Sequence, residues 1–199
     1  LKRDAAVYGV NTGFGKLASV RIPDAQLGEL QTNLIRSHAC GVGQPLDEPT
    51  VRLAMLLRIN SLIQGNSGVR PEVVDALLAM INSPVYPFVP SKGSVGASGD
   101  LAPLAHIALA LLGEGKVFVG GKLKPAKAAL AKAGLKPVTL QAKEGLALIN
   151  GTQIIQAIGL TSVCGMRRWI KVCDAAAALS LEALRGSDSP FDARVAPIR

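Results

Sequence analysis

Aromatic residues make up only 4% of this 199-residue chain, although its net charge is +8. Nucleic-acid-binding surfaces usually combine basic residues with aromatic side chains on which bases stack. Here the lysines between Lys116 and Lys143 stand singly among alanine, leucine and glycine. The sequence therefore predicts a solvated lysine face, with no nucleic-acid partner. A basic balance would also attract a small carboxylate-bearing substrate.

Long uninterrupted hydrophobic runs are missing as well. A bilayer-spanning helix needs about 20 predominantly apolar residues, and a run such as residues 107–112 falls far short of that. The sequence starts at Leu1 without the charged start and apolar centre of a signal peptide, and residues 195–199 provide no closing element. We therefore expect a soluble, cytoplasmic protein without a membrane partner, and a sequence that is cut at both ends.

Cysteine is scarce and unpatterned. Cys40, Cys164 and Cys173 are an odd number, lack CxxC spacing and have apolar neighbours in the sequence. This pattern favours a reducing compartment over a disulfide framework. We expect three buried, inert thiols and no metal site.

Hydrophobic residues, in contrast, make up 49% of the chain, enough for a substantial core. Apolar residues recur with helical spacing and are bounded by proline, acidic residues or glycine. The chain between 84 and 90 carries three prolines and predicts a stiff extended arm. Residues 116–124 predict a small hairpin around Gly-Gly. The predicted helices are residues 24–37, 48–64, 71–82, 101–112, 125–133 and one long helix from about 150 to 184.

The arm leads into the glycine-rich segment 93–100 (GSVGASGD). Such small residues bury little, so the segment is shaped for backbone geometry. Asp100 stands at the expected N-cap of the next helix, Pro103 lies in its first turn and Gly113 ends it. The loop would then end at the positive pole of a helix dipole. An ordinary loop-to-helix junction is the alternative interpretation.

Three further polar segments interrupt the apolar pattern. Residues 8–15 (YGVNTGFG) are rich in glycine but do not have the spacing of a phosphate-binding loop. Ser37 and His38 close a predicted helix beside two glycines, where a histidine is a candidate ligand for a small molecule. Residues 150–153 (NGTQ) predict a helix cap whose side chains face a cleft. His106, within an apolar helix, is expected to be structural.

Four segments together resemble the aromatic amino acid ammonia-lyases: residues 8–15, 37–43, 96–104 and 145–153. The resemblance runs from about residue 5 to about residue 195, and the Ala-Ser-Gly-Asp motif is highly specific. It implies a mainly α, fumarase/aspartase-like helical fold that is incomplete, with a small β-hairpin and glycine-rich active-site loops. Residues 1–199 would form one partial domain, which carries the prosthetic group and runs into the first long helix of the central bundle.

The resemblance also implies a prosthetic group. In this family Ala97, Ser98 and Gly99 would cyclise into methylidene-imidazolone, so no external cofactor is needed. The Gly99 nitrogen must approach the Ala97 carbonyl carbon, which the missing side chain permits, and Ser98 then loses water to leave an exposed methylene. The helix behind Asp100 would help to stabilise negative charge that develops on the ring.

The implied reaction is elimination of ammonia from L-histidine to give trans-urocanate. His38, with Ser37 beside it, would bind the imidazole, because family members acting on phenylalanine carry Phe-Leu at these positions and those acting on tyrosine carry His-Leu. Tyr8 would remove the β-proton, which requires a partner that stabilises its phenolate. Asn150 would contact the substrate or the prosthetic group, and Gln153, one turn further, is a secondary candidate.

Two departures and two alternatives accompany the resemblance. Family chains are more than twice this long and form homotetramers, and their second half supplies an arginine for the substrate carboxylate. The 199-residue chain alone is therefore expected to have little or no activity. One alternative is a tyrosine or phenylalanine ammonia-lyase or an aminomutase with the same group. The other is a non-catalytic helical fragment with an uncyclised loop.

Overall fold

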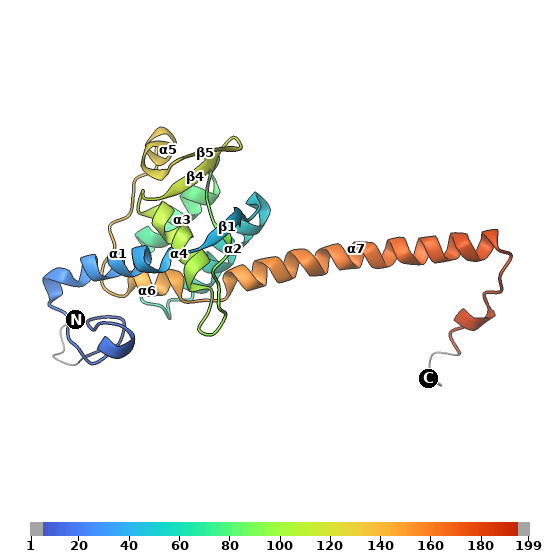
Figure 1. The fold of residues 1–199 in the computed structure, drawn as a ribbon, viewed down its shortest axis with the longest axis horizontal. Helices are drawn as coiled ribbons and strands as arrows, with labels where there is room; N and C mark the ends of the chain where they lie inside the picture. The colour runs from blue at the N-terminus through green and yellow to red at the C-terminus, as the bar shows by residue number, and fades with distance from the viewer. Residues whose placement is uncertain (1–5, 195–199) are drawn as a thin grey trace. The chain divides into compact units, whose positions relative to one another are not determined.

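The computed structural model describes residues 6–194, which form helices and a few short strands (Figure 1). The chain divides into two compact units, and the boundary falls between Ile158 and Gly159, inside the long helix α7 (Gln153–Ala183). The first unit contains the segments that the sequence marked as functional. The mainly helical fold is the one that the resemblance implied.

Four helices of the first unit build most of its core. They are α1 (Leu27–His38), α2 (Glu48–Leu62), α3 (Pro71–Ile81) and α4 (Leu101–Leu111). α4 packs against α1 and α3, and α2 packs against α3. α4 buries most of its residues because small alanines alternate with leucines around it. The four helices confirm the ranges predicted from apolar spacing, to within a few residues at the ends.

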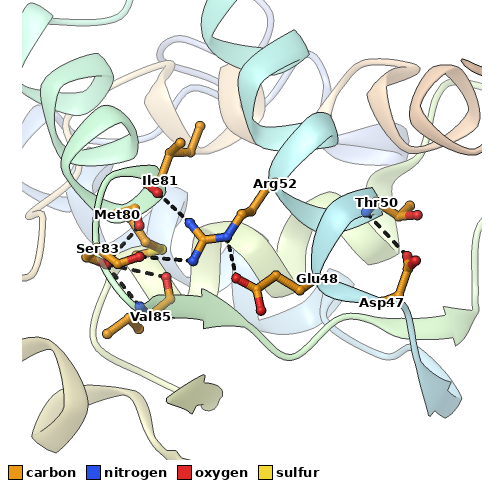
Figure 2. Close-up of polar contacts among 8 residues, drawn as sticks. All are labelled: Asp47, Glu48, Thr50, Arg52, Met80, Ile81, Ser83 and Val85. Atoms are coloured by element: carbon orange, nitrogen blue, oxygen red, sulfur yellow. Dashed lines mark hydrogen bonds and ion pairs between the residues drawn. The ribbon is translucent and has the colours of Figure 1, made fainter. Parts of the chain in front are cut away.

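Polar side chains fix the ends of α2 and α3 (Figure 2). Asp47 caps α2 by accepting a hydrogen bond from the Thr50 N–H at 3.3 Å. Arg52 pairs with Glu48 one turn earlier, at 2.6 Å, and donates to the carbonyl oxygens of Ile81, the last residue of α3, and of Ser83 just after it. These carbonyls have no helical partner, so Arg52 satisfies them and ties α2 to α3.

The strands form two small antiparallel sheets. β1 (Val42–Pro45) pairs with β3 (Pro90–Lys92), and β2 (Val85–Pro87) pairs with β4 (Lys116–Val119). β5 (Lys122–Pro125) completes the predicted hairpin with β4, and α5 (Ala126–Lys132) follows it against the same hairpin (Figure 1). Both strands of the proline-rich arm are therefore paired, β2 with β4 and β3 with β1. Each is an edge strand, where proline is tolerated.

Two 3-10 turns, η1 (Gly15–Leu17) and η2 (Asp24–Gln26), precede α1. α6 (Glu144–Ile149) is a short helix that the sequence reading did not predict, and it packs against α1 and α4. The junction 150–152 separates α6 from α7. The predicted long helix is confirmed, although it begins at Gln153.

The second unit consists of the rest of α7 and η3 (Ser189–Phe191). Apolar side chains of this unit are exposed, including Met166, Trp169 and Leu179. By length and composition alone, Glu144–Ala183 could cross a membrane, a test that core helices of soluble proteins also pass. Scattered polar residues interrupt its apolar pattern, so this segment contains no long uninterrupted hydrophobic run.

The prediction of buried thiols is wrong. Cys40, Cys164 and Cys173 are all exposed. Cys164 and Cys173 lie on the part of α7 whose apolar side chains no other described element covers, and Cys40 lies in the turn after α1. Apolar neighbours in the sequence bury a residue only where another element packs on that face.

Candidate active site

A cavity of about 260 Å³ lies where the turn after α1 meets the glycine-rich loop. Residues from three segments line it: the end of α1, the loop before α4 and the first turn of α4. The lining residues are Ser37, His38, Cys40, Gly93, Val95, Ala97, Ser98, Gly99, Leu101 and Ala102. The structure thus brings together Ser37, His38 and the Ala97-Ser98-Gly99 tripeptide, which the sequence separates by about sixty residues.

The loop before α4 is held by its last residue. Asp100 is fully buried, accepts a hydrogen bond from Ser94 Oγ at 2.8 Å and another from the Ile155 N–H at 2.9 Å. Asp100 does stand at the N-cap position of α4, but its side chain makes no capping bond there. The expected cap is therefore corrected: the carboxylate caps α7, because Ile155 is one of the first residues of that helix and has no helical acceptor.

Gly99 has no room for a side chain. Its φ is +96°, and a Cβ built on it would lie 2.6 Å from the Gly151 carbonyl oxygen and 2.9 Å from the Gly151 nitrogen. The next residue continues the contact, since the Asp100 N–H donates to the same Gly151 oxygen at 2.6 Å. Both the backbone angle and the close approach require glycine at position 99.

Asn150, in the junction between α6 and α7, contacts the same loop through its side chain. Its Nδ2 donates to the Ser98 carbonyl oxygen at 2.7 Å and lies 3.5 Å from Ser98 Oγ. Ser98 itself is exposed and lines the cavity. The α6–α7 junction therefore forms a template that fixes the backbone of residues 98–100 while leaving Ser98 open to the cavity.

His38 presents one nitrogen to the cavity. Its Nδ1 lies 2.8 Å from the Leu34 carbonyl oxygen and 3.1 Å from Ser37 Oγ. A carbonyl oxygen can only accept, so Nδ1 carries a proton and Nε2 is the acceptor in the neutral ring. The same Ser37 hydroxyl donates to Leu34 O at 2.9 Å. Ser37 thus helps to fix the ring and its tautomer.

His106 holds the turn that follows His38. The Gly41 N–H donates to His106 Nε2 at 3.1 Å, so the imidazole must be neutral. Burial on α4 lowers the pKa of His106, which favours that neutral form. The structural role expected for His106 agrees with these contacts, which hold Gly41 next to the cavity-lining Cys40.

Tyr8 and Gln153 are not brought to this cavity. Tyr8 is half exposed and its ring stands edge-on to Phe14, with the ring centroids 6.0 Å apart. Gln153 is buried, and its Oε1 accepts a hydrogen bond from Arg58 Nη1 at 3.0 Å. Gln153 therefore faces the interior of the first unit rather than the cavity.

Arg58 is a residue that the sequence reading missed. It lies on α2, is 5% exposed, and also donates to the carbonyl oxygen of Ala147 on α6. Burial lowers its pKa to about 10. An arginine inside a strongly apolar helix was the signal that could have found it, since such residues are almost never buried without a partner.

The residues present fit a group made from the chain. Position 99 leaves no space for a Cβ, and Ala97 and Ser98 are small and exposed to the cavity. Hydrogen bonds hold both the Ser98–Gly99 peptide and the Gly99–Asp100 peptide. A cyclised tripeptide needs these features, because the ring closes through backbone atoms and must leave Ser98 Cβ accessible.

The chain belongs to the family of aromatic amino acid lyases, whose model matches residues 1–199, and its fold is the one seen in solved structures of that family. Several curated relatives of the chain are named histidine ammonia-lyase, which is a carbon–nitrogen lyase. The chain is 56% identical over 192 residues to the one from Aromatoleum aromaticum and 54% identical over 189 residues to the one from Geobacillus kaustophilus.

These alignments cover 96% and 95% of the chain, but 36% and 38% of the relatives. The chain thus spans a little over a third of the length of the curated relatives it matches. Among solved structures, histidine ammonia-lyase from Trypanosoma cruzi matches with a TM-score of 0.90 and 45% identity, over 98% of this chain and 38% of that one. Phenylalanine aminomutase from Pantoea agglomerans matches with a TM-score of 0.93 and 39% identity, over the same shares of the two chains.

Proposed function

We propose that the protein that carries this sequence is a histidine ammonia-lyase, which eliminates ammonia from L-histidine to give trans-urocanate. The observation that carries the proposal is the shared cavity of His38 and the Ala97-Ser98-Gly99 tripeptide. The names of the relatives from Aromatoleum aromaticum and Geobacillus kaustophilus support the same substrate.

The tripeptide forms the prosthetic group by losing two waters. The Gly99 nitrogen bonds to the Ala97 carbonyl carbon. The carbonyl oxygen leaves as water with one hydrogen from the Gly99 nitrogen and one from the Ser98 nitrogen, so a double bond forms between Ala97 C and Ser98 N. Ser98 then loses its hydroxyl with the hydrogen on its Cα, which makes the second water and leaves a double bond between Cα and Cβ. When formed, the group supplies an electrophilic methylene carbon at the Cβ of residue 98.

His38 binds the imidazole ring of the substrate. Its Nε2 accepts the N–H of the substrate imidazole, while Nδ1 stays bonded to Leu34 O. A phenyl ring offers no hydrogen-bond donor and would leave the histidine nitrogen unpaired, so a site of this kind can reject apolar analogues strongly. Ser37 keeps the imidazole of His38 in the orientation that this bond needs.

Asn150 orients the electrophile, and Tyr8 accepts the β-proton of the substrate. Asn150 already donates to the Ser98 carbonyl oxygen, an atom that the cyclised group retains. Tyr8 lies on the turn at residues 7–11, outside the cavity lining. We assign it the proton transfer in the assembled enzyme, whose sites draw on more than one subunit according to the resemblance.

The part of the relatives' length that this chain does not cover affects both activity and assembly. We propose that residues 1–199 form the part that carries the prosthetic group, within a homotetrameric, cytoplasmic enzyme. The 199-residue chain alone has little or no turnover, because it lacks the arginine that binds the substrate carboxylate. The apolar side chains that α7 exposes in the second unit, such as Trp169, suit burial in a helix bundle.

The test is a substrate comparison with a matched variant. The protein that carries this sequence is incubated with L-histidine, L-phenylalanine and L-tyrosine, and the conjugated acrylate product is followed by its ultraviolet absorbance. We expect product from histidine, and a loss of about 100-fold or more in kcat/KM for His38→Leu, which removes the acceptor. Product from tyrosine or phenylalanine without product from histidine would overturn the assignment in favour of another lyase or an aminomutase.

A further inference from the structure

Arg58 is buried without a carboxylate partner. Among the ion pairs of residues 6–194 none involves this guanidinium, and its Nε is a buried atom without a hydrogen-bond partner in the same part of the chain. A buried cation without a counter-charge is costly to fold. A neutral side chain of similar size would avoid this cost, so stability alone does not explain an arginine here.

The two acceptors of Arg58 lie on either side of one short segment. Nη2 donates to the carbonyl of Ala147, in the last turn of α6, where carbonyl oxygens lack helical donors. Nη1 donates to the side chain of Gln153, the first residue of α7. The planar fork of the guanidinium therefore fixes the spacing between the end of α6 and the start of α7.

The segment between these anchors touches the reactive loop. Within it, Asn150 donates to the Ser98 carbonyl, and the Gly151 carbonyl accepts from Asp100. Gly151 also abuts the guanidinium itself, because a Cβ on Gly151 would collide with Arg58 Nη1 and Gln153 Oε1. Gly151 therefore contacts both the Arg58 guanidinium and the loop that carries Ser98.

We propose that Arg58 is a positioning residue for the formation of the prosthetic group: its guanidinium, bound to Ala147 O and Gln153 Oε1, holds Asn150 and Gly151 as the template on which residues 97–99 cyclise. The proposal rests on the proposed function, since that function requires the loop to cyclise. It assigns Arg58 no contact with the substrate. Its action runs through the junction alone.

The test compares two arginines on the same helix. Arg58→Met and Arg52→Met both remove a guanidinium that α2 uses to bind backbone carbonyls, but Arg52 contacts the end of α3 instead of the junction (Figure 2). The protein is made by cell-free synthesis, and its intact mass is measured at timed intervals. We expect the two-water loss to be about 10- to 100-fold slower in Arg58→Met, as for a small misplacement of reacting groups, and unchanged in Arg52→Met.

Two further variants separate geometry from charge and from folding. Arg58→Lys keeps the charge but is a point donor, so it should restore the rate only in part. Gln153→Met removes one acceptor of Arg58 and leaves its contact with Ala147, so it should slow the loss of water less than Arg58→Met does. If Arg58→Met does not fold, Gln153→Met still tests the proposal. Wild-type kinetics in Arg58→Met, complete rescue by lysine, or equal slowing in Arg52→Met would overturn the proposal.

A second measurement does not depend on cyclisation. If the wild-type chain keeps its full mass, the proposed function fails, and amide hydrogen exchange then tests Arg58 separately. Arg58→Met should speed exchange of the Asp100 amide, which bonds to Gly151 O, by about 10-fold or more, and leave the amide of Leu77 in α3 unchanged. Equal acceleration at both amides would mean general destabilisation, and no acceleration at Asp100 would mean that Arg58 does not hold the junction.

Discussion

Gly99 combines two constraints that an added methyl group would violate together. Its φ of +96° disfavours any side chain, and the Gly151 oxygen lies 2.6 Å from where a Cβ would stand. Gly99→Ala should therefore lower the free energy of unfolding by about 1–3 kcal/mol and prevent loss of the two waters. Denaturant unfolding and intact mass measure the two effects.

Gly120→Ala is the matched control for this change. Gly120 also has a positive φ, +57°, but a Cβ there would meet no atom within 4 Å. It should cost about 1–2 kcal/mol through backbone strain alone and leave the mass deficit intact. If Gly99→Ala lost the two waters normally, the close approach to Gly151 would have no part in shaping the reactive loop.

His106 predicts a pH dependence of stability. Burial lowers its pKa below the ordinary value of 6.5, and its Nε2 must stay unprotonated to accept from Gly41. The unfolded chain therefore takes up a proton before the folded one as the pH falls, so stability is complete above about pH 6.5 and declines below it. Unfolding free energies measured between pH 7.5 and 5.5 should fall in the wild type.

His106→Gln should remove that slope, since glutamine does not titrate, and should cost about 1 kcal/mol at pH 7.5 through the altered bond to Gly41. His38→Gln, which changes the other histidine of the chain, serves as the control and should keep the part of the slope that comes from His106. A pH dependence of stability that persists unchanged in His106→Gln would show that His106 does not cause it.

Some residues of the site could be predicted from the sequence, whereas the partners of others could not. Ser37, His38, Ala97, Ser98 and Gly99 were recognisable as local motifs, and the cavity unites them. The partners of other side chains depend on distant segments. Asp100 has the right local position to cap α4 but bonds to Ile155, and Gln153 turns inward to Arg58. Periodicity within one helix carries no information about such contacts.

Among the elements, α6 depends most on a polar anchor. Glu144, its first residue, is 1% exposed and accepts hydrogen bonds from Arg70 Nε at 2.8 Å and from the Gln141 N–H at 2.7 Å. Burial acts to raise the pKa of Glu144, but the bonds from Arg70 and the backbone outweigh it and hold the pKa below 4.5. This carboxylate thus fixes the start of the helix whose end leads to Asn150.

Glu144→Gln should destabilise the protein by about 3 kcal/mol at pH 7, because it removes a buried carboxylate that accepts from Arg70 and from two backbone N–H groups, and places an amide where only an acceptor fits. The pKa is depressed in the folded state, so the contribution of Glu144 is present above about pH 4.5 and lost as the pH falls through the folded-state value. Wild type and variant should therefore converge in stability at acidic pH.

Glu48→Gln provides the comparison for this prediction. Glu48 also pairs with an arginine, but it is 45% exposed, so its loss should cost less than about 1 kcal/mol. Chemical unfolding at pH 7 and pH 4 measures both variants. A Glu144→Gln variant as stable as the wild type at pH 7 would show that α6 does not depend on this anchor.

The elements themselves were mostly predictable. α2, α3, α4 and α7 have apolar spacing and clear capping or proline signals, and the hairpin of β4 and β5 has its Gly-Gly turn. The third strand of that sheet, β2, and the short helix α6 were not predicted. β2 is a strand because it pairs with β4, and α6 is held by Glu144 and by packing on α1 and α4, so tertiary contacts decide both.

At the scale of the whole molecule, the chain supplies one part of an enzyme site. It holds the tripeptide, the histidine to which we assign the substrate ring and the junction on which the loop rests, and it spans a little over a third of the length of its curated relatives. The sequence alone could identify the family through four separated motifs. It could not show that the α6–α7 junction is the surface on which the reactive loop rests.

The proposed function requires that Ala97, Ser98 and Gly99 become a prosthetic group. The most direct test is the mass of the protein, followed by the mass of the tryptic peptide from Gly93 to Lys116. We expect a deficit of two waters that lies in this peptide and disappears in Ser98→Ala. The full sequence mass in the wild-type protein, or a deficit that survives in Ser98→Ala, would contradict it.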